Sequence, residues 1–343
     1  MSPDRPSILD VAARAGVSPA TVSRSLRGLA KVAPQTRRRV LDAAAELSYV
    51  ASPQAAGLAS GRTGAVAVVV PFITRWFFST VVAGVTDALR ESGYDTVLYH
   101  LGGADHRDRF FEQMPLARKV DGILSLSMPL TEDHTLALRA LDLPLVSVGS
   151  HIPGSPSVRI DEVAAARTAV NHLLNQGHER IGFIAGTPDD PRFGFASSEL
   201  RRQGYESALS AAGLTQDPEL VASGPHGLDG GSAAMTQLLT GSVLPTAVFA
   251  EYDELALGAL WALRRAGMHV PEAMSIVGID DHEMAPLVEL TTVAQDAHEQ
   301  GSVAAHLLLQ ALGAPAADLA GTDLVLPTRL VLRSSTAPPR QFR

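Results

Sequence analysis

The sequence contains no cysteine among its 343 residues. Disulfide bonds, thiolate nucleophiles and cysteine-ligated zinc or iron–sulfur centres are therefore excluded. Nowhere do about eighteen apolar residues follow one another, which is the length that a membrane-spanning helix needs. The N-terminal segment also lacks the apolar run of an export signal. We expect a cytoplasmic protein without a membrane span.

The motifs of several enzyme classes are missing too. No Gly-x-Gly-x-x-Gly or phosphate-binding loop follows a predicted strand, and there is no Gly-x-Ser-x-Gly nucleophile motif. The eleven histidines show no metal-ligand spacing. Asp280 and Asp281 are adjacent at a strand end, where neighbouring side chains point in different directions and cannot flank one scissile bond. We expect no enzymatic activity, no cofactor and no metal site.

Charge is distributed unevenly along the chain, whose formal net charge is -8. The first 62 residues contain nine Arg or Lys and four acidic residues, a net charge of +5, so the remainder carries -13. A basic head on an acidic body suits a protein that presents one end to phosphates and keeps the other away from them.

Three short helices are predicted in this basic head. The first extends from Ser7 to Gly16, the second from Ser18 to Gly28, and the third begins at Pro34. The second helix turns a polar and basic face outward, made of Pro19, Ala20, Ser23, Arg24 and Arg27. Two helices joined by a tight turn, the second with an exposed polar start, are typical of a helix-turn-helix that enters the major groove. The alternative is a small helical subdomain with a solvated basic face.

A short linker follows the head. Its sequence has a helix start at Ser52-Pro53 and a stop at Gly61, so only about two helical turns fit, and a helix of that length is unstable alone. Leu58 is its only large apolar side chain. This leucine could pack on the body of the protein or insert into DNA.

The body alternates apolar, β-rich runs with amphipathic helices, which predicts parallel sheets covered on both faces. About 280 residues exceed one such sheet, so we expect two lobes. Ligands of such sheets bind beyond the carboxyl ends of the strands. The residues that follow the predicted strands there include Phe72, Arg75, Trp76, Phe77, Asp161, Tyr252 and Asp280.

Aromatic rings, carboxylates and an arginine suit a sugar, which packs its C–H face on rings and offers its hydroxyls to charged partners. Alternatively, Trp76 and Phe77 belong to the core. We interpret Asp253 as a helix N-cap rather than a ligand-binding residue.

The segment Ile8–Arg24, with its Asp-Val-Ala, Ala-Gly-Val-Ser and Thr-Val-Ser-Arg runs, resembles the head of the LacI/GalR family, the lactose and galactose repressors. Asp253-Glu-Leu-Ala-Leu-Gly, Ser275–Asp281 and Leu326–Ser335 resemble the sensor domain of the same family. The resemblance implies an N-terminal all-α helix-turn-helix domain followed by an α/β, two-lobed sensor domain like the type I periplasmic binding proteins. The implied domains are residues 1–50 (head), 51–63 (hinge) and 64–343 (sensor), with an N-lobe of about 64–163 and 294–324 and a C-lobe of about 164–293 and 325–343.

The resemblance also implies roles for residues of the head. It places Pro19, Ala20 and Arg24 at base-reading positions, and Ser18, Thr21 and Ser23 against phosphates. Ser7 and Arg27 are assigned to the same DNA-binding surface. Leu58 matches the leucine that inserts into the minor groove between two protomers.

In the sensor domain, the resemblance implies that Arg201 and Asp280 grip the effector. Asp161 matches a further pocket acid, His226 matches an aromatic that stacks on the effector, and Gln295 joins the same set. The chain departs from the family pattern at Tyr252, which replaces an Asn or Asp, and at Phe72, which replaces a common Asp. Both changes make the expected pocket more aromatic.

Taken together, we expect a homodimeric repressor that binds a palindromic operator and is controlled by a small-molecule effector, by default a sugar that relieves repression. Two alternatives stay open. The chain could need a corepressor, or it could be a carbohydrate-binding or transport protein without regulatory DNA binding. No leucine heptad follows Ser335, so a helical tetramerisation segment is not expected.

Overall fold

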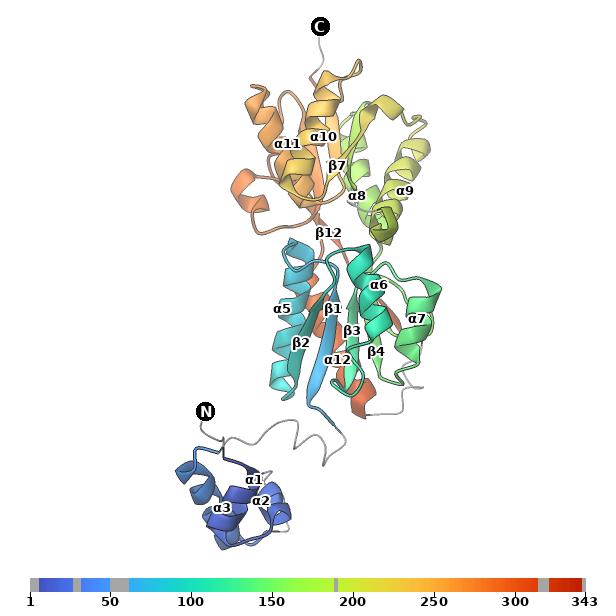
Figure 1. Cartoon of the computed structure of the whole chain (residues 1–343). Helices are drawn as coiled ribbons and strands as arrows, with labels where there is room; N and C mark the ends of the chain where they lie inside the picture. The colour runs from blue at the N-terminus through green and yellow to red at the C-terminus, as the bar shows by residue number, and fades with distance from the viewer. Residues whose placement is uncertain (1–5, 27–31, 50–61, 188–190, 314–320, 341–343) are drawn as a thin grey trace. The chain divides into compact units, whose positions relative to one another are not determined.

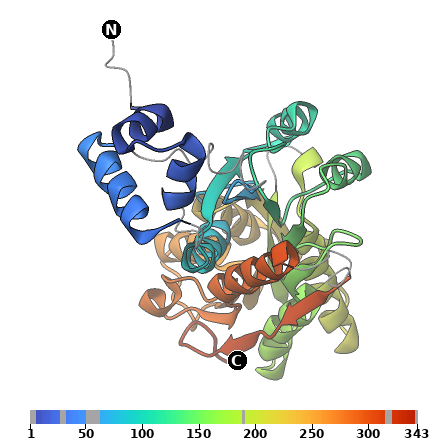
Figure 2. The same cartoon turned by 90° about the horizontal axis from the view of Figure 1, so that it is seen from below.

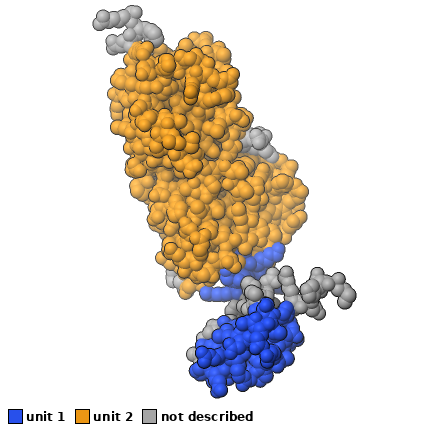
Figure 3. All heavy atoms as spheres, turned by 90° about the vertical axis from the view of Figure 1, so that its left-hand side faces the viewer, with its two compact units in different colours: residues 1–64, 118–120 blue, residues 65–117, 121–343 orange. Residues whose placement is uncertain are grey.

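The computed structural model describes residues 6–26, 32–49, 62–187, 191–313 and 321–340. The chain divides into two compact units, shown in Figure 3: residues 1–64 with 118–120, and residues 65–117 with 121–343. Within the described ranges, no helix is both long and apolar enough to cross a membrane.

The first unit contains three helices, α1 (Ile8–Ala15), α2 (Pro19–Leu26) and α3 (Pro34–Glu46), labelled in Figure 1. A reciprocal capping box starts α1: the Ser7 amide donates to Asp10 Oδ2 at 2.8 Å, and the Asp10 amide donates to Ser7 Oγ at 3.4 Å. Gly16 ends α1 with a left-handed backbone, φ 63°. One residue from each helix is completely buried where the three meet: Val11, Val22 and Val40.

The second unit contains two six-stranded sheets, one in each lobe. The first has the order β11-β5-β4-β3-β1-β2, and every pair in it is parallel. Its strands are β1 (Ala65–Val70), β2 (Asp95–His100), β3 (Gly122–Leu126), β4 (Leu145–Val148), β5 (Ser157–Ile160) and β11 (Asp323–Leu326). The helices of this lobe are α5 (Trp76–Glu91), α6 (Ala104–Gln113), α7 (Glu132–Arg139) and α12 (Ala297–Gly313).

The second sheet has the order β12-β10-β9-β8-β6-β7, and only the edge strand β12 is antiparallel. Its strands are β6 (Ile181–Thr187), β7 (Val221–Pro225), β8 (Ala247–Ala250), β9 (Ser275–Asp280), β10 (Thr291–Ala294) and β12 (Arg329–Val331). Its helices are α8 (Glu162–Asn175), α9 (Ala196–Ala211), α10 (Leu228–Thr240) and α11 (Asp253–Arg265). Three short 3-10 turns follow β6, α9 and β9, respectively: η1 (Pro191–Phe193), η2 (Pro218–Leu220) and η3 (Ala285–Val288).

Both faces of the second sheet are buried, as its continuous apolar strands predict. Successive residues of a strand point to opposite faces, so Phe249 packs with α8 and α9, whereas its neighbour Val248 packs with α10 and α11. In the first sheet, α5 and α12 cover one face and lie side by side over β1 and β3 (Figure 2). The predicted two-lobed α/β fold is therefore confirmed.

The chain passes between the lobes three times, after β5, after β10 and after β11. The carboxyl ends of the strands of the two sheets consequently face one another across these connections, as Figure 1 shows. A ligand site beyond the strand ends can therefore be built from both lobes at once.

The close approach of α8 and α9 depends on Gly204. A Cβ at this position would lie 2.6 Å from both Ala166 Cβ and the Val163 carbonyl oxygen. Although alanine has the higher helix propensity, by about 1 kcal/mol, relieving a clash with backbone has the larger effect, about 1–3 kcal/mol. We expect Gly204→Ala to lower the thermal unfolding midpoint. The matched control is Gly313→Ala, where no atom lies within 4 Å of the new Cβ. An unchanged midpoint for Gly204→Ala would contradict the helix packing described here.

Candidate functional site

The exposed face of α2 gathers most residues that the sequence predicted for the head. Ser18, Pro19, Ala20 and Arg24 are exposed there, while Val22 turns inward. The Thr21 amide donates to Ser18 Oγ at 3.2 Å, which caps the start of the helix. Proline and alanine side chains have no hydrogen-bonding group, so the guanidinium of Arg24 is the most capable donor on this face.

Three other predicted residues of the head need separate comment. Ser7 is exposed, and its hydroxyl donates to Asp10 at 2.7 Å, so the structure gives it a capping role in α1. Arg27 and Leu58 lie outside the described residues, as does most of the predicted hinge, 51–61.

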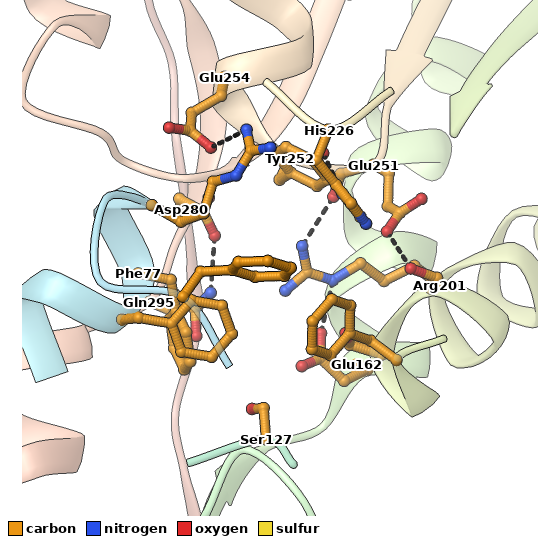
Figure 4. A pocket seen from close by; sticks show the side chains of 16 residues that line it. Phe77, Ser127, Glu162, Arg201, His226, Glu251, Tyr252, Glu254, Asp280 and Gln295 are labelled. Atoms are coloured by element: carbon orange, nitrogen blue, oxygen red, sulfur yellow. Dashed lines mark hydrogen bonds and ion pairs between the residues drawn. The ribbon is translucent and has the colours of Figure 1, made fainter. Parts of the chain in front are cut away.

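In the second unit, a pocket with a cavity of about 90 Å³ lies at the strand ends, between the lobes (Figure 4). It adjoins a wider cleft of about 1240 Å³, with which it shares four residues: Ser127, Glu162, Phe195 and Ser197. Eight predicted effector residues line the pocket: Phe72, Arg75, Phe77, Arg201, His226, Tyr252, Asp280 and Gln295. The sequence reasoning missed eight others: Phe78, Ser127, Glu162, Phe195, Ser197, Ser198, Glu251 and Glu254.

Arg201, on α9, is buried in this pocket. Its Nε donates to Glu162 Oε2 at 2.6 Å, and one of its terminal nitrogens donates to the Glu251 carbonyl oxygen at 2.8 Å. Although burial alone would lower the pKa of a guanidinium, the surrounding carboxylates raise the pKa of Arg201. Arg201 is therefore charged and already has strong partners.

Asp280 ends β9 opposite this arginine. Its Oδ1 accepts a hydrogen bond from the Gln295 side-chain amide at 2.6 Å, and Gln300 donates in turn to Gln295 Oε1 at 2.9 Å. Burial raises the pKa of Asp280 to about 7, although the nearby guanidinium of Arg201 and the Gln295 amide act in the opposite direction. Its backbone has φ 136°, a strained conformation for a residue other than glycine, and such strain is common at functional sites.

Glu251, at the end of β8, supplies another buried carboxylate. It accepts hydrogen bonds from the Ser198 hydroxyl and from the Gly186 amide, the latter at 3.0 Å. Burial raises the pKa of Glu251 above its ordinary value, against the lowering effects of Ser198 and of the charge on Arg201.

Aromatic rings complete the pocket wall. His226 Nδ1 lies 2.7 Å from the Tyr252 hydroxyl, and the ring of Phe195 meets His226 edge-on, with 5.7 Å between centroids. Phe72, from the other lobe, packs edge-on against Phe195 at 6.1 Å. Burial raises the pKa of Tyr252, so this phenol stays protonated at neutral pH.

Three expectations need correction. Trp76 does not line the pocket: it starts α5, and its ring lies 5.5 Å from the tilted ring of His282, which belongs to the other lobe. Asp161 is exposed and caps α8 through its bond from the Ala164 amide, while the next residue, Glu162, turns into the pocket.

The third correction concerns Asp253, whose interpretation as a helix N-cap is wrong. Tyr252 occupies the cap position of α11, and Asp253 is the first helical residue. Asp253 is 0% exposed and accepts bonds from the His282 amide at 2.9 Å and the Thr292 hydroxyl at 2.8 Å. It therefore fastens α11 to the segment after β9 and to β10. Among the described residues, no group of three or more acidic or histidine side chains could hold a metal ion.

An exposed recognition-type helix in a three-helix unit, together with a buried polar pocket between two sheets, defines a ligand-responsive helix-turn-helix regulator. Residues 7–52 match the family model for bacterial regulatory proteins of the lacI family, and residues 170–336 match the periplasmic binding protein-like domain. The chain is 35% identical over 331 residues to the HTH-type transcriptional repressor CytR of Escherichia coli (strain K12), which covers 95% of each protein. It is 36% identical over 343 residues to the HTH-type transcriptional regulator CelR of Thermobifida fusca, which covers 96% of this chain and 98% of that protein.

Solved structures agree with these matches. The Lac repressor dimer bound to operator and the anti-inducer ONPF is similar over 97% of this chain and 100% of that one, with 27% identity and a TM-score of 0.85. The complex of the transcriptional regulator CelR with cellobiose is similar over 96% and 100%, with 34% identity and a TM-score of 0.71. The chain belongs to the LacI family: it is a DNA-binding transcriptional regulator and not an enzyme.

The raised pKa of Asp280 predicts how stability depends on pH. The ordinary pKa of this carboxyl is 3.8, against about 7 in the fold, so between about pH 4 and 7 the folded state binds more protons than the unfolded state. The stability that this carboxyl contributes is therefore fully present below pH 4 and is lost as the pH rises through 7. The loss in the free energy of unfolding is at most about 4 kcal/mol. We expect Asp280→Asn to melt at the same temperature as the wild type near pH 4, and at a higher temperature at pH 8.

The control for this measurement is Asp95→Asn, which removes one exposed charge from the edge strand β2. It should follow the wild type at every pH. Parallel melting curves for Asp280→Asn and the wild type from pH 4 to 8 would contradict the raised pKa.

Proposed function

We propose that this regulator acts as a homodimeric repressor at a palindromic operator, and that a small hydroxylated ligand bound between the lobes relieves repression. One observation carries the proposal: the same chain presents the exposed face of α2 and a buried polar pocket lined by both lobes. A ligand that contacts both lobes favours one arrangement of the two, and such coupling between sites is typically about 1–3 kcal/mol.

In the head, α2 reads the major groove. Arg24 is exposed on this helix and can donate two hydrogen bonds to a guanine. Pro19 and Ala20 offer apolar contact to thymine methyl groups, while Ser18, Thr21 and Ser23 hold phosphates. The Lac repressor structure, a dimer bound to operator, supports this assignment by similarity.

Substitution of Arg24 tests this reading. A preferred duplex is first selected from random sequences with the full-length protein. Arg24→Ala should then weaken binding to it by about ten- to hundredfold, the value of one bidentate base contact. The matched control is Arg38→Ala, which removes an exposed charge from α3; it should weaken selected and random duplexes equally. A variant at Arg24 that keeps the full preference for the selected duplex would refute the assignment.

In the pocket, the ligand is of the sugar type. The rings of His226, Tyr252 and Phe195 suit the C–H face of a sugar, and the side chains of Asp280 and Glu251 suit its hydroxyls. Two relatives support this by their bound ligands: CelR with cellobiose, and a LacI family regulator from Enterococcus faecium with ribose, the latter 31% identical over 80% of this chain with a TM-score of 0.71.

The homodimer is supported by apolar side chains that a single chain leaves exposed. Around the 3-10 turn η3, Met284 is 42% exposed, Leu287 74% and Val288 40%. Three large apolar side chains within one turn mark a surface that another protein covers, and symmetric pairing is the most frequent arrangement.

A charge on this turn should prevent dimer formation. We expect Leu287→Asp to convert the full-length protein from dimer to monomer in sedimentation velocity at micromolar concentration, because a buried unpaired carboxylate is unfavourable. Leu244→Asp places the same charge on another exposed leucine, which is 48% exposed. This control should remain dimeric. A dimeric Leu287→Asp variant would show that η3 lies outside the interface.

A further inference from the structure

The charges that line the pocket do not balance. Two arginines face four carboxylates, and each arginine already has a carboxylate partner. Arg201 lies 2.6 Å from Glu162, and Arg75 lies 3.8 Å from Glu254. Glu251 and Asp280 remain, and the pocket lining offers no third arginine or lysine to either of them.

Two of the five N–H donors of Arg201 are already in use. Its side chain is only 7% exposed, and two of its nitrogens already donate, one to Glu162 and one to the Glu251 carbonyl. The carboxylates of Glu251 and Asp280 add negative potential around it. A phosphate or carboxylate in this pocket would therefore meet four acidic side chains, and a guanidinium that already donates to Glu162 and to the Glu251 carbonyl.

A buried carboxylate can be neutralised by a proton or by a cation. In the pocket without ligand, the raised pKa values of Asp280 and Glu251 favour the proton. A ligand ammonium group can replace that proton, and in a buried site the resulting charged hydrogen bond is stronger than one from a hydroxyl.

The aromatic wall favours the same kind of ligand. The rings of Phe77, Phe195, His226 and Tyr252 line the pocket together with the two carboxylates, as Figure 4 shows for the labelled residues among them. The faces of aromatic rings attract cations and also accept the C–H face of a saturated ring.

We propose that the pocket selects a hydroxylated ring that carries a protonated amine, as in an amino sugar, over neutral and anionic sugars. This inference rests on the proposed effector role of the pocket and names the chemical class of the effector. Asp280 and Glu251 supply the negative charge that attracts the ammonium group, and the aromatic rings pack on the ring of the ligand.

Isothermal titration of the full-length protein at pH 7 tests the proposal with three matched groups of probes. The amines are D-glucosamine, D-galactosamine and D-mannosamine; the neutral probes are the three parent hexoses; the anionic probes are the three hexose 6-phosphates. At least one amine should bind about tenfold more tightly than its parent hexose, a difference of about 1.4 kcal/mol, and the phosphates should not bind.

Variants of the two carboxylates then test the assignment. Asp280→Asn and Glu251→Gln should each reduce the preference for the amine to less than about threefold. Because each variant is tested separately, the failure of one to fold leaves the other as a test. The matched control is Glu206→Gln, a partly exposed carboxylate on the same helix as Arg201 whose partner is Arg202. It should keep the preference.

The outcomes separate this inference from the proposed function. A hexose or a phosphate that binds as tightly as the amine overturns the charge preference and leaves the sensing role intact. A preference that survives in both variants overturns the assignment of the two carboxylates. No binding by any amine also overturns the inference, whereas the DNA-binding role is judged by the Arg24 experiment, which uses no ligand.

Discussion

A buried guanidinium needs compensating charge and fixed hydrogen-bond acceptors, and the centre of the sensor domain is organised around that requirement. Arg201 is held by the carboxylate of Glu162 and the carbonyl of Glu251, each from a different element of the C-lobe. An unpaired charge in this position would cost several kcal/mol. The strands and helices that carry these acceptors are positioned by the parallel sheet. The sheet therefore also fixes where the side chains of the pocket lie.

The same polar network crosses between the lobes. Gln300 lies in the first turn of the N-lobe helix α12, Gln295 lies on the connection after β10, and Asp280 ends a C-lobe strand; two hydrogen bonds join them in series. Arg75 and Glu254 form a second link between the lobes. A group that changes the charge or the partners of Asp280 therefore acts on contacts that hold one lobe against the other.

Much of the fold follows from the sequence because apolar periodicity is a direct consequence of burial. The run Ala65–Val70 predicts β1 to the residue, since both faces of a parallel strand are covered. The strands β7, β10, β11 and β12 were not predicted. β7, β11 and β12 lie at sheet edges and contain exposed residues, whereas the buried strand β10 has only four residues, two of which are threonine. The helix ends of the head were predictable from capping residues, as Ser7, Gly16 and Ser18 show. The helix-turn-helix prediction also needed the polar face of the second helix and the family resemblance.

The location of the pocket was predictable from the sequence, whereas the charged residues that line it were predicted only in part. Arg201 and Asp280 were named from family resemblance, whereas Glu162 and Glu251, the hydrogen-bond partners of Arg201, were not. At the start of α8 the capping residue is the acid itself, so the next side chain enters the pocket.

At the start of α11 the acid lies one position after the capping residue. A tyrosine takes the cap position there, and the acid after it is buried in the core. Sequence shows an acid beside a helix start in both cases, and both preceding strands have four residues. The cap Asp161 follows β5 directly, whereas one residue, Glu251, lies between β8 and the cap Tyr252.

That single-residue offset has a chemical consequence. An acid that caps a helix is solvated and adds little to a ligand site, whereas an acid one position later is desolvated and must be paired. Glu162 takes the second kind of position and binds the arginine that would otherwise be free to grip a ligand. In the function proposed above, the charge of the pocket is therefore set by the residues that resemble the family together with the neighbours that pair with them.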